Sequence, residues 1–242
     1  MDKTYYEAFF RVQEKHWWFA SKKKIILGLL EKYVAKDCEQ NILDIGCGSG
    51  LMLNDLSQFG VVTGMDASNE AINFSRQIFN GKIVKGALPT DIPFNENSFQ
   101  LIVALDVIEH IDDDICALRK IYSIARTGGV VVLTVPAYQF LWSRHDILNE
   151  HKRRYTLSEL KKKVELSGFQ IEKITYFNSL LFIPIAFIRL VNYLLKRESD
   201  SDVKIPHPYV NLILRQIFSL ESKFIGRVSM PFGVSLACVL RK

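Results

Sequence analysis

Cysteine is scarce in this 242-residue chain, and long apolar runs are missing from it. The four cysteines, Cys38, Cys47, Cys116 and Cys238, lie far apart and form no C-x-x-C pair. This spacing argues against a disulfide framework and a zinc ribbon, both of which use closely spaced cysteines. No stretch reaches the roughly 20 apolar residues that cross a bilayer, so no transmembrane span is predicted.

The first residues, MDKTYYEAFF, combine charged and aromatic side chains where a signal peptide has a continuous apolar core. We therefore expect a cytoplasmic protein. Residues 1–38 mix aromatic residues, a lysine triplet and the run IILGLL, which predicts an N-terminal helical lid over the core. The net charge of +5 is small, and it does not choose among nucleic acid, anionic lipid and an acidic substrate as partners.

Short apolar segments alternate with helical ones from residue 41 onward, an order typical of a parallel sheet covered by helices on both faces. Strands are predicted at 41–45, 61–65, 82–85, 100–105, 130–135, 169–177 and 234–240, and helices at 51–59, 68–79, 112–126 and 156–168. Ser68, Asp112 and Thr156 are the expected N-caps, and Gly128 and Gly168 the expected helix stops. The pattern predicts one α/β domain over residues 1–242.

Residues 178–232 separate the last two predicted strands, and this stretch is too long for a loop. It contains one amphipathic helix after Leu180, a charged linker at 196–204 and a second amphipathic helix at 209–225. The apolar face predicted for the second helix holds Val210, Ile213, Leu214, Ile217, Leu220 and Phe224, and the polar side holds Arg215, Ser219 and Ser222. This insertion is expected either to rest on a membrane surface or to close over a hydrophobic substrate. The sequence does not separate these two roles, because both need the same amphipathic pattern. Phe182, Phe187 and Phe218 are the expected membrane contacts.

A glycine-rich loop, DIGCGSG at 44–50, follows the first predicted strand. Gly46, Gly48 and Gly50 let the backbone turn tightly beside a ligand. Asp66 ends the next strand 20 residues after Gly46, where a carboxylate can hold two ribose hydroxyls. A dinucleotide site has the spacing G-x-G-x-x-G, and Asp44 would repel a pyrophosphate. The loop therefore favours a cofactor that carries a nucleoside and an ammonium group.

The segments LDIGCGSG and GMDAS resemble the first two motifs of the class I S-adenosylmethionine-dependent methyltransferases. The resemblance covers about residues 40–177. Within the family, this part of the chain is similar to the type 11 and type 23 methyltransferase domains and to the ubiquinone-pathway O-methyltransferases. It implies a Rossmann-like seven-stranded sheet, mostly parallel with an antiparallel last strand. It also implies S-adenosyl-L-methionine as the cofactor and S-adenosyl-L-homocysteine as the product.

The cofactor-binding residues that the resemblance implies are Asp44, Gly46, Gly48, Gly50, Asp66, Ala67, Leu88 and Leu105. The chain departs from the family at Ala87, where many members carry Asp. The amino group of the adenine is therefore expected to find another partner, such as Asp91.

Methyl transfer is an in-line displacement that needs no metal and no covalent intermediate. If the acceptor is a hydroxyl, a base must take its proton, and a histidine with an unperturbed pKa of about 6.5 suits the task. His151, and after it His145, are the predicted catalytic residues, because they follow the fifth strand at the carboxyl edge of the sheet. The neighbouring Arg153 and Arg154 either clamp an acidic head group or form a solvated loop.

Asp106, Glu109 and His110 follow the fourth strand with a spacing that suits a hard cation, and they resemble the ubiquinone-pathway enzymes in this. The same residues can simply begin a helix and pack near the cofactor. No metal site is predicted.

The predicted function is methylation of a small-molecule or lipid-linked acceptor at a hydroxyl, with residues 178–232 available for peripheral contact with the inner face of the membrane. An RNA methyltransferase is an alternative favoured by the basic run HKRR, although the Asn/Asp-Pro-Pro-aromatic sequence and a Pro-Cys pair are missing. A protein that binds the cofactor without catalysis is another, because fold alone does not establish chemistry. The acceptor and the oligomeric state are left open.

Overall fold

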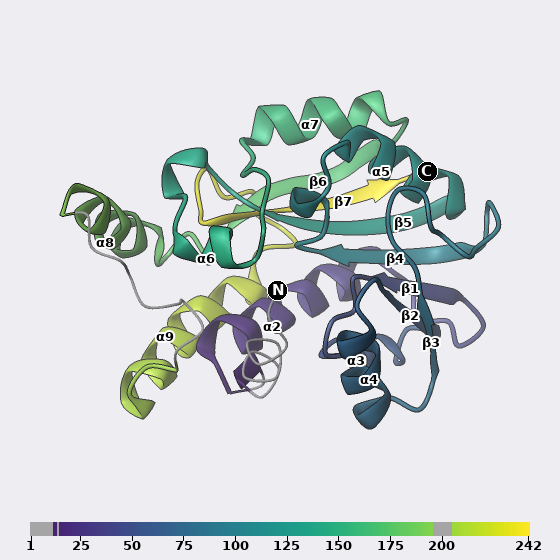
Figure 1. The fold of residues 1–242 in the computed structure, drawn as a ribbon, viewed down its shortest axis with the longest axis horizontal. Helices are drawn as coiled ribbons and strands as arrows, with labels where there is room; N and C mark the ends of the chain where they lie inside the picture. The colour runs from purple at the N-terminus through teal and green to yellow at the C-terminus, as the bar shows by residue number, and fades with distance from the viewer. Residues whose placement is uncertain (1–11, 14, 196–204) are drawn as a thin grey trace.

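The computed structural model describes residues 12, 13, 15–195 and 205–242. In this part of the chain seven strands form one sheet in the order β3-β2-β1-β4-β5-β7-β6 (Figure 1). The strands are β1 (Asn41–Ile45), β2 (Val61–Asp66), β3 (Lys82–Lys85), β4 (Phe99–Leu105), β5 (Ala125–Pro136), β6 (Gln170–Phe177) and β7 (Ser235–Arg241). β7 runs antiparallel to β5 and β6, and the other neighbours are parallel. The seven-stranded sheet predicted from the sequence is confirmed.

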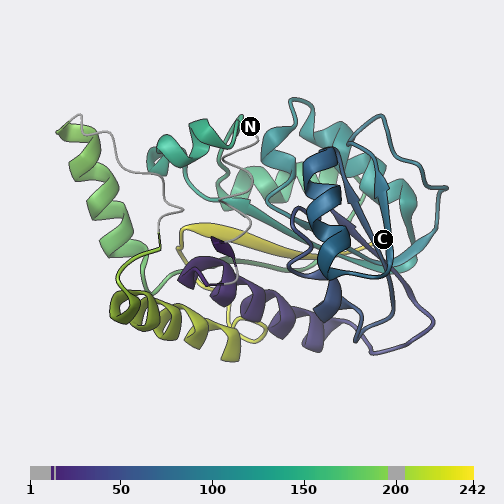
Figure 2. The same ribbon diagram turned by 60° about the horizontal axis from the view of Figure 1, so that its bottom comes forward.

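Helices cover both faces of the sheet (Figures 1 and 2). The helices are α2 (Trp17–Tyr33), α3 (Leu53–Leu56), α4 (Asn69–Ile78), α5 (Asp114–Ile124), α6 (Arg144–Leu148), α7 (Leu157–Leu166), α8 (Phe182–Leu194) and α9 (Pro208–Leu220), with single 3-10 turns η1 (Ile108–His110), η2 (Gln139–Leu141) and η3 (Glu221–Lys223). α5 and α7 lie on one face, and α2, α3, α4 and α9 on the other.

The central strands are apolar at successive positions because both of their faces are buried. In β5 and β7, Leu133 and Cys238 belong to the core on the side of α5 and α7. Val132 and Val239 belong to the core on the side of α2. All four side chains are at most 1% exposed. A strand with this burial cannot show the polar alternation of an exposed sheet.

Local capping signals correctly locate the starts of α4 and α7. The predicted capping box of α7 is present, since Thr156 N donates to Glu159 Oε2 at 2.8 Å and Glu159 N donates to Thr156 Oγ1 at 3.3 Å. Ser68 caps α4 by accepting from Ala71 N at 3.3 Å.

The predicted boundaries of α5 were wrong. Its N-cap is Asp113, whose carboxylate accepts from Cys116 N at 2.9 Å, so Asp112 lies outside the helix. The helix ends at Ile124, and Gly128 lies within β5, which begins at Ala125 because this residue pairs with β4. The pairing of Ala125 with β4 therefore ends the helix before the chain reaches Gly128. The region predicted as the helix 51–59 holds only the single turn α3, and the short α6 was not predicted.

Helix α2 packs against α9 through small side chains. Ser219 Oγ donates to Ser21 Oγ at 3.0 Å, and Ser21 Oγ donates to the Arg215 carbonyl at 3.1 Å. A Cβ added to Gly28 would lie 2.9 Å from the Ser222 carbonyl oxygen, so this close approach requires glycine. The predicted faces of α9 were therefore wrong in part. Its small polar residues turn inward because they permit the close approach.

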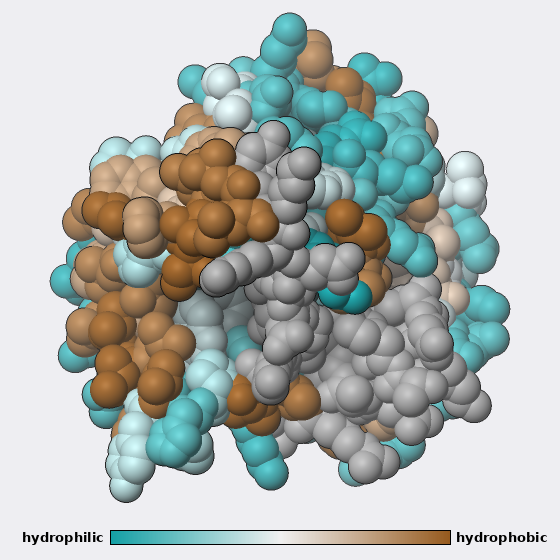
Figure 3. Space-filling model, turned by 60° about the vertical axis from the view of Figure 1, so that its left-hand side comes forward, coloured by the Kyte–Doolittle hydropathy of each residue, from teal (hydrophilic) through white to brown (hydrophobic). Residues whose placement is uncertain are grey.

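Part of the apolar surface of α9 is exposed, and most of the apolar surface of α8 is exposed as well. None of the described side chains of α8 is buried. Apolar side chains of these two helices that are exposed by between 47% and 74% include Ile183, Phe187, Ile188, Leu190, Leu194, Tyr209, Val210, Leu212 and Ile213. We call this set the α8–α9 apolar face. Figure 3 shows apolar surface gathering on the side of the molecule that carries these two helices.

Of the three phenylalanines expected at a membrane, only Phe187 is exposed. Phe218 is fully buried, and the ring of Phe182 packs against Phe232 at 5.3 Å between centroids. The charged linker at 196–204 lies outside the described residues, as do residues 1–11 of the expected lid. None of the described helices has the length and apolar character needed to cross a bilayer.

Candidate active site

The glycine loop joins β1 to α3 and is tied to the end of β2. Gly46, Gly48 and Gly50 have φ values of 68°, 54° and 82°, in the left-handed region that glycine adopts without strain. A Cβ at Gly46 would lie 2.7 Å from Val107 Cγ2, so no side chain fits there. Gly48 N donates to Asp66 Oδ2 at 2.9 Å. The carboxylate of Asp66 therefore holds the loop in position.

Two acidic residues lie under this loop. Asp44 is 3% exposed, and burial together with the nearby charge of Asp66 raises its pKa to about 8. Burial also raises the pKa of Asp66, although backbone hydrogen bonds from Ser68 and Gly48 oppose the rise. A pair of carboxylates in a buried loop favours the binding of a cation, because the cation offsets their mutual repulsion.

A cavity of about 430 Å³ lies above the loop at the carboxyl edge of the sheet. The predicted cofactor residues that line it are Asp44, Gly46, Gly48, Asp66, Ala67, Leu88 and Leu105. Gly50 does not line it, and its backbone instead lies near Leu53 and Ser75. Asp91, the expected partner of the adenine, is exposed and does not line the cavity, although its backbone pairs with that of Ala87, which does.

Lys22, of the lysine triplet at 22–24, also reaches this cavity. Lys22 comes from α2, is 8% exposed and forms an ion pair with Asp106 at the end of β4. Burial opposes ionisation of Asp106, but the Lys22 ammonium holds the pKa of Asp106 below its usual value. Asp106 has a φ of 55°, and its Oδ1 accepts from Thr134 Oγ1 at 2.9 Å. The contact of Lys22 with Asp106 joins residues 84 positions apart, so no local pattern reveals it.

The two predicted catalytic histidines lie close together beside this cavity, with ring centroids 6.0 Å apart. His145 is on α6, and His151 follows it. His151 Nδ1 lies 2.9 Å from Asp146 Oδ1, and Asp146 is fully buried. A buried carboxylate at this nitrogen orients the ring and leaves Nε2 available. His145 instead contacts the Asn149 amide, so the geometry favours His151 as the base.

Arg154 holds Asp146 by two hydrogen bonds, Nε to Oδ1 at 2.8 Å and Nη2 to Oδ2 at 2.9 Å. Burial opposes ionisation of Asp146, yet the His151 hydrogen bond and the Arg154 charge hold its pKa well below the usual range. Arg153 donates to Asp114 at 3.1 Å. Both guanidinium groups thus hold carboxylates of this chain, which argues against the clamp for an acidic head group, one of the two alternatives that the sequence left open.

A second cavity, of about 290 Å³, lies between α2, α6 and α8. Its apolar wall includes Trp17, Ile185, Ile188, Pro206 and Val234, and its polar wall includes Arg154, Arg189 and Asn192. Trp18, Phe19, Asp106, His145 and His151 line both cavities. The two cavities therefore meet at the histidines and at Asp106, so a cofactor in the first can face an acceptor in the second.

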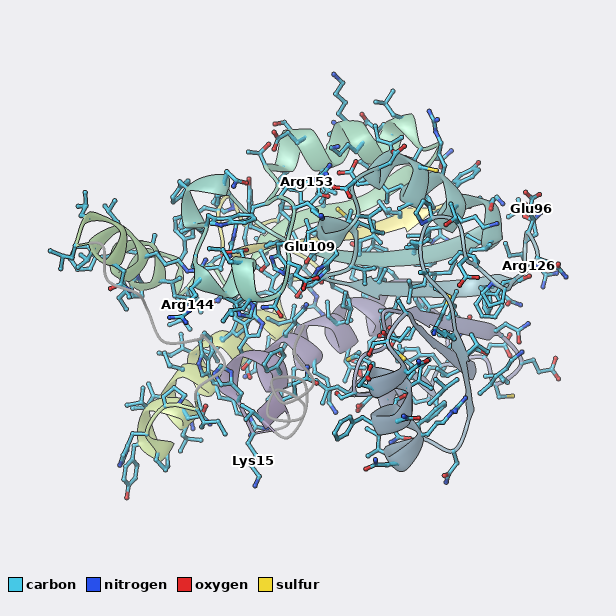
Figure 4. The ribbon with its side chains drawn as sticks, in the orientation of Figure 1. Lys15, Glu96, Glu109, Arg126, Arg144 and Arg153 are labelled. Carbon is cyan, nitrogen blue, oxygen red and sulfur yellow. The ribbon has the colours of Figure 1, made fainter. Side chains whose placement is uncertain are left out.

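Three groups including His151, of which Glu109 lines neither cavity, have the spacing of a metal site. Donor atoms of Glu109, His110 and His151 all lie within 4.8 Å of one another. Figure 4 shows Glu109 in the interior of the molecule, whereas Lys15 and Arg126 lie at its outer edge.

Comparison with known proteins agrees with this geometry. A family model described as "Methyltransferase domain" matches residues 15–174. The chain is 24% identical over 164 residues to a Mycolicibacterium smegmatis protein named "Probable S-adenosylmethionine-dependent methyltransferase", covering 66% of this chain and 62% of that one. It is 26% identical over 159 residues to the ubiquinone biosynthesis O-methyltransferase of Sinorhizobium fredii, covering 57% and 64%. The match thus spans less than two thirds of either relative.

Among solved structures, the fold is similar to that of a Haloferax volcanii protein in complex with the methyltransferase activator Trm112. The TM-score is 0.60 at 17% identity, with 95% of this chain and 91% of that one covered.

Proposed function

Because the chain belongs to the class I S-adenosylmethionine-dependent methyltransferases, we propose that it transfers a methyl group from that cofactor to a hydroxyl of a lipid-like small molecule. The observation that carries the proposal is the meeting of the two cavities at His145, His151 and Asp106. The apolar wall of the second cavity suits a hydrocarbon body, and Arg189 and Asn192 suit a polar group. In this proposal residues 178–232 cap the acceptor, with Ile185 and Ile188 of α8 over it.

In the proposed reaction the cofactor lies over the glycine loop, with its ribose at Asp66 and its ammonium group near Asp44. The acceptor oxygen attacks the methyl carbon in line with the departing sulfur, and the sulfonium becomes a neutral thioether. His151 takes the hydroxyl proton on Nε2, while Asp146 stabilises the resulting imidazolium. The aromatic side chains of Trp18 and Phe19 exclude water from the junction.

The test is transfer of labelled methyl groups from S-adenosylmethionine into a lipid extract by the purified chain. We expect His151→Ala to lower the turnover about 10²–10⁴-fold, because general-base catalysis typically contributes a factor of this size. The cofactor Kd should be unchanged. His207→Ala, which changes an exposed histidine at the start of α9, is the matched control. A turnover of His151→Ala equal to that of the control would exclude the role of His151.

The same assay separates the alternatives. An RNA extract is included because of the basic run HKRR, and label appearing in RNA but not in lipid would show that the acceptor is RNA. Cofactor binding without transfer to either extract would favour a non-catalytic binding protein.

We also propose that this protein touches the inner face of the membrane through the α8–α9 apolar face. Support comes from its exposed side chains, such as Phe187 at 64% and Ile213 at 55%, beside an acceptor cavity with an apolar wall. We expect the chain to co-sediment with anionic vesicles and Phe187→Ser with Ile213→Ser to release it. Val61→Ser, an exposed apolar residue at 58% on β2, is the control. Absence of vesicle binding by the unaltered chain would refute this contact.

A further inference from the structure

We propose that Glu221 is a positioning residue, which fixes α8 against the helix pair α2–α9 and thereby sets the shape of the second cavity, where the acceptor is expected. Glu221 begins η3, directly after α9, and its side chain is fully buried. Its carboxylate accepts hydrogen bonds from three consecutive backbone amides, those of Asn178 and Ser179 at 2.7 Å and that of Leu180 at 2.9 Å. These amides belong to the turn between β6 and α8, so the contact joins two ends of the insertion.

The turn at 178–180 is shaped to hold a carboxylate. Asn178 has a φ of 54°, a left-handed conformation that asparagine adopts more readily than most residues. A turn of this kind can direct successive N–H groups toward one point, where they attract an anion. Burial raises the pKa of Glu221, and the three hydrogen bonds oppose that rise. Because a buried carboxylate is costly without such bonds, the contact is a specific one between these two segments.

Packing alone does not place α8. Its described side chains are exposed or half-buried, so they form no fully buried face that would fix the helix. The amides that Glu221 binds lie directly before the start of α8 at Phe182, so they fix the direction in which the helix leaves the sheet. Figures 1 and 2 show α8 extending from the edge of the fold. The anchor at its start therefore has a large share in where the rest of the helix lies.

One side of α8 forms a wall of the second cavity. The residues of α8 that line this cavity are Ile185, Ile188, Arg189 and Asn192. Their spacing of i, i+3, i+4 and i+7 places them on one side of the helix. A helix rises about 1.5 Å per residue, so Asn192 lies about 15 Å along the axis from Phe182. A tilt of about 10° at the start would move Asn192 by about 2.6 Å, nearly the diameter of a water molecule.

The opposite wall of the cavity comes from α2, and Glu221 is tied to that wall as well. Trp17 and Trp18 of α2 line the cavity. η3 packs on α2 so closely that a Cβ added to Gly28 would lie 2.9 Å from the carbonyl oxygen of Ser222, the residue after Glu221. Glu221 thus sets the distance between the two walls. The inference rests on the proposed function for the identity of the ligand in this cavity, but the anchoring of α8 can be measured without any ligand.

The first test is amide hydrogen exchange of the full chain without ligand. We expect the amides of residues 178–188 to exchange about 10–100-fold faster in Glu221→Ala, because a hydrogen bond to a charged group contributes a factor of this size. Glu221→Gln, which keeps one acceptor oxygen, should show a smaller increase, and the amides of α7 should be unchanged in both. Glu96→Gln, which changes an exposed glutamate at the outer edge of the molecule (Figure 4), is the matched control. Unchanged exchange in α8, or an equal increase in α7, would overturn the anchor.

The second test measures the cavity with dodecanol, a probe that carries a hydroxyl on a hydrocarbon chain. Its binding is followed by the fluorescence of Trp17 and Trp18, after circular dichroism has established that each variant is folded. We expect Glu221→Ala to weaken dodecanol binding about tenfold or more, the factor for losing contact with one buried apolar side chain. The Kd of S-adenosylmethionine should be unchanged, because α2 stays packed on α9. Leu160→Ala, which removes a fully buried side chain on the other face of the sheet, controls for a general loss of stability and should bind dodecanol as the unaltered chain does.

The outcomes separate the anchor from the acceptor. Equal dodecanol binding by Glu221→Ala and the unaltered chain would overturn the role of Glu221 in shaping the cavity. An equal weakening of dodecanol and S-adenosylmethionine binding would do the same, because it would indicate a general loss of structure. Absence of dodecanol binding by the unaltered chain would contradict the acceptor class of the proposed function, and hydrogen exchange would still decide whether Glu221 fixes α8.

Discussion

Replacing Asp44 by Asn tests the electrostatics of the cofactor loop. Asp44 is buried beside Asp66, and its pKa in the folded protein is about 8, against 3.8 for an unperturbed Asp. Between these two pH values the folded chain keeps the proton that the unfolded chain releases. The free energy of unfolding therefore falls as the pH rises through this range, and the contribution of the bound proton is lost near pH 8. Asn has nearly the same shape and does not titrate.

The size of the expected stability change follows from the slope of the free energy of unfolding against pH. One proton of difference between the two states changes the free energy of unfolding by about 1.4 kcal/mol per pH unit. Between pH 5 and pH 7, the unaltered chain should lose about 2.7 kcal/mol relative to Asp44→Asn. The variant is then the more stable form of the free protein above neutral pH, although it lacks the carboxylate that we expect near the cofactor ammonium.

The assay is urea unfolding of both proteins, without cofactor, at pH 5, 6 and 7. Comparison of the two curves removes the titration of all other groups. Asp112→Asn, whose carboxylate belongs to a side chain 85% exposed, controls for the loss of one acidic residue. Parallel pH dependences for Asp44→Asn and the unaltered chain would refute the buried, protonated state of Asp44.

Three further substitutions test the cofactor anchor, the helix packing and the loop that orients His151. Asp66→Asn should weaken S-adenosylmethionine binding about 10–100-fold in calorimetry, because a charge-assisted hydrogen bond contributes about 1.5–3 kcal/mol. Phe218→Ala should lower the free energy of unfolding by about 3–5 kcal/mol in urea, since this ring is fully buried between α9 and the sheet, and an unchanged midpoint would contradict that packing. Arg154→Lys should lower turnover but not cofactor affinity, because a lysine cannot make both hydrogen bonds to Asp146.

The sequence identified the elements that local patterns encode. The predicted strands, the capping box at Thr156 and the glycine loop before Asp66 all depend on residues close together in the chain. These signals are local because a buried strand, a helix cap and a tight turn each impose their own residue types. The boundaries of α5 escaped prediction because the pairing of Ala125 with Phe99 is a contact between distant residues.

Only the tertiary structure decided which of these residues act together. Lys22 reaches Asp106 across 84 residues, and this ion pair removes Asp106 from the cation pattern of its own segment. His151 reaches Glu109 from the loop after α6 and completes a different set of donors. In α9 the small side chain of Ser219 packs inward beside the apolar Phe218, whereas Val210 and Ile213 of the predicted apolar face are exposed, so amphipathicity alone did not decide which face is buried. Periodicity states which residues share a face, but the shape of the neighbouring surface decides which face is buried.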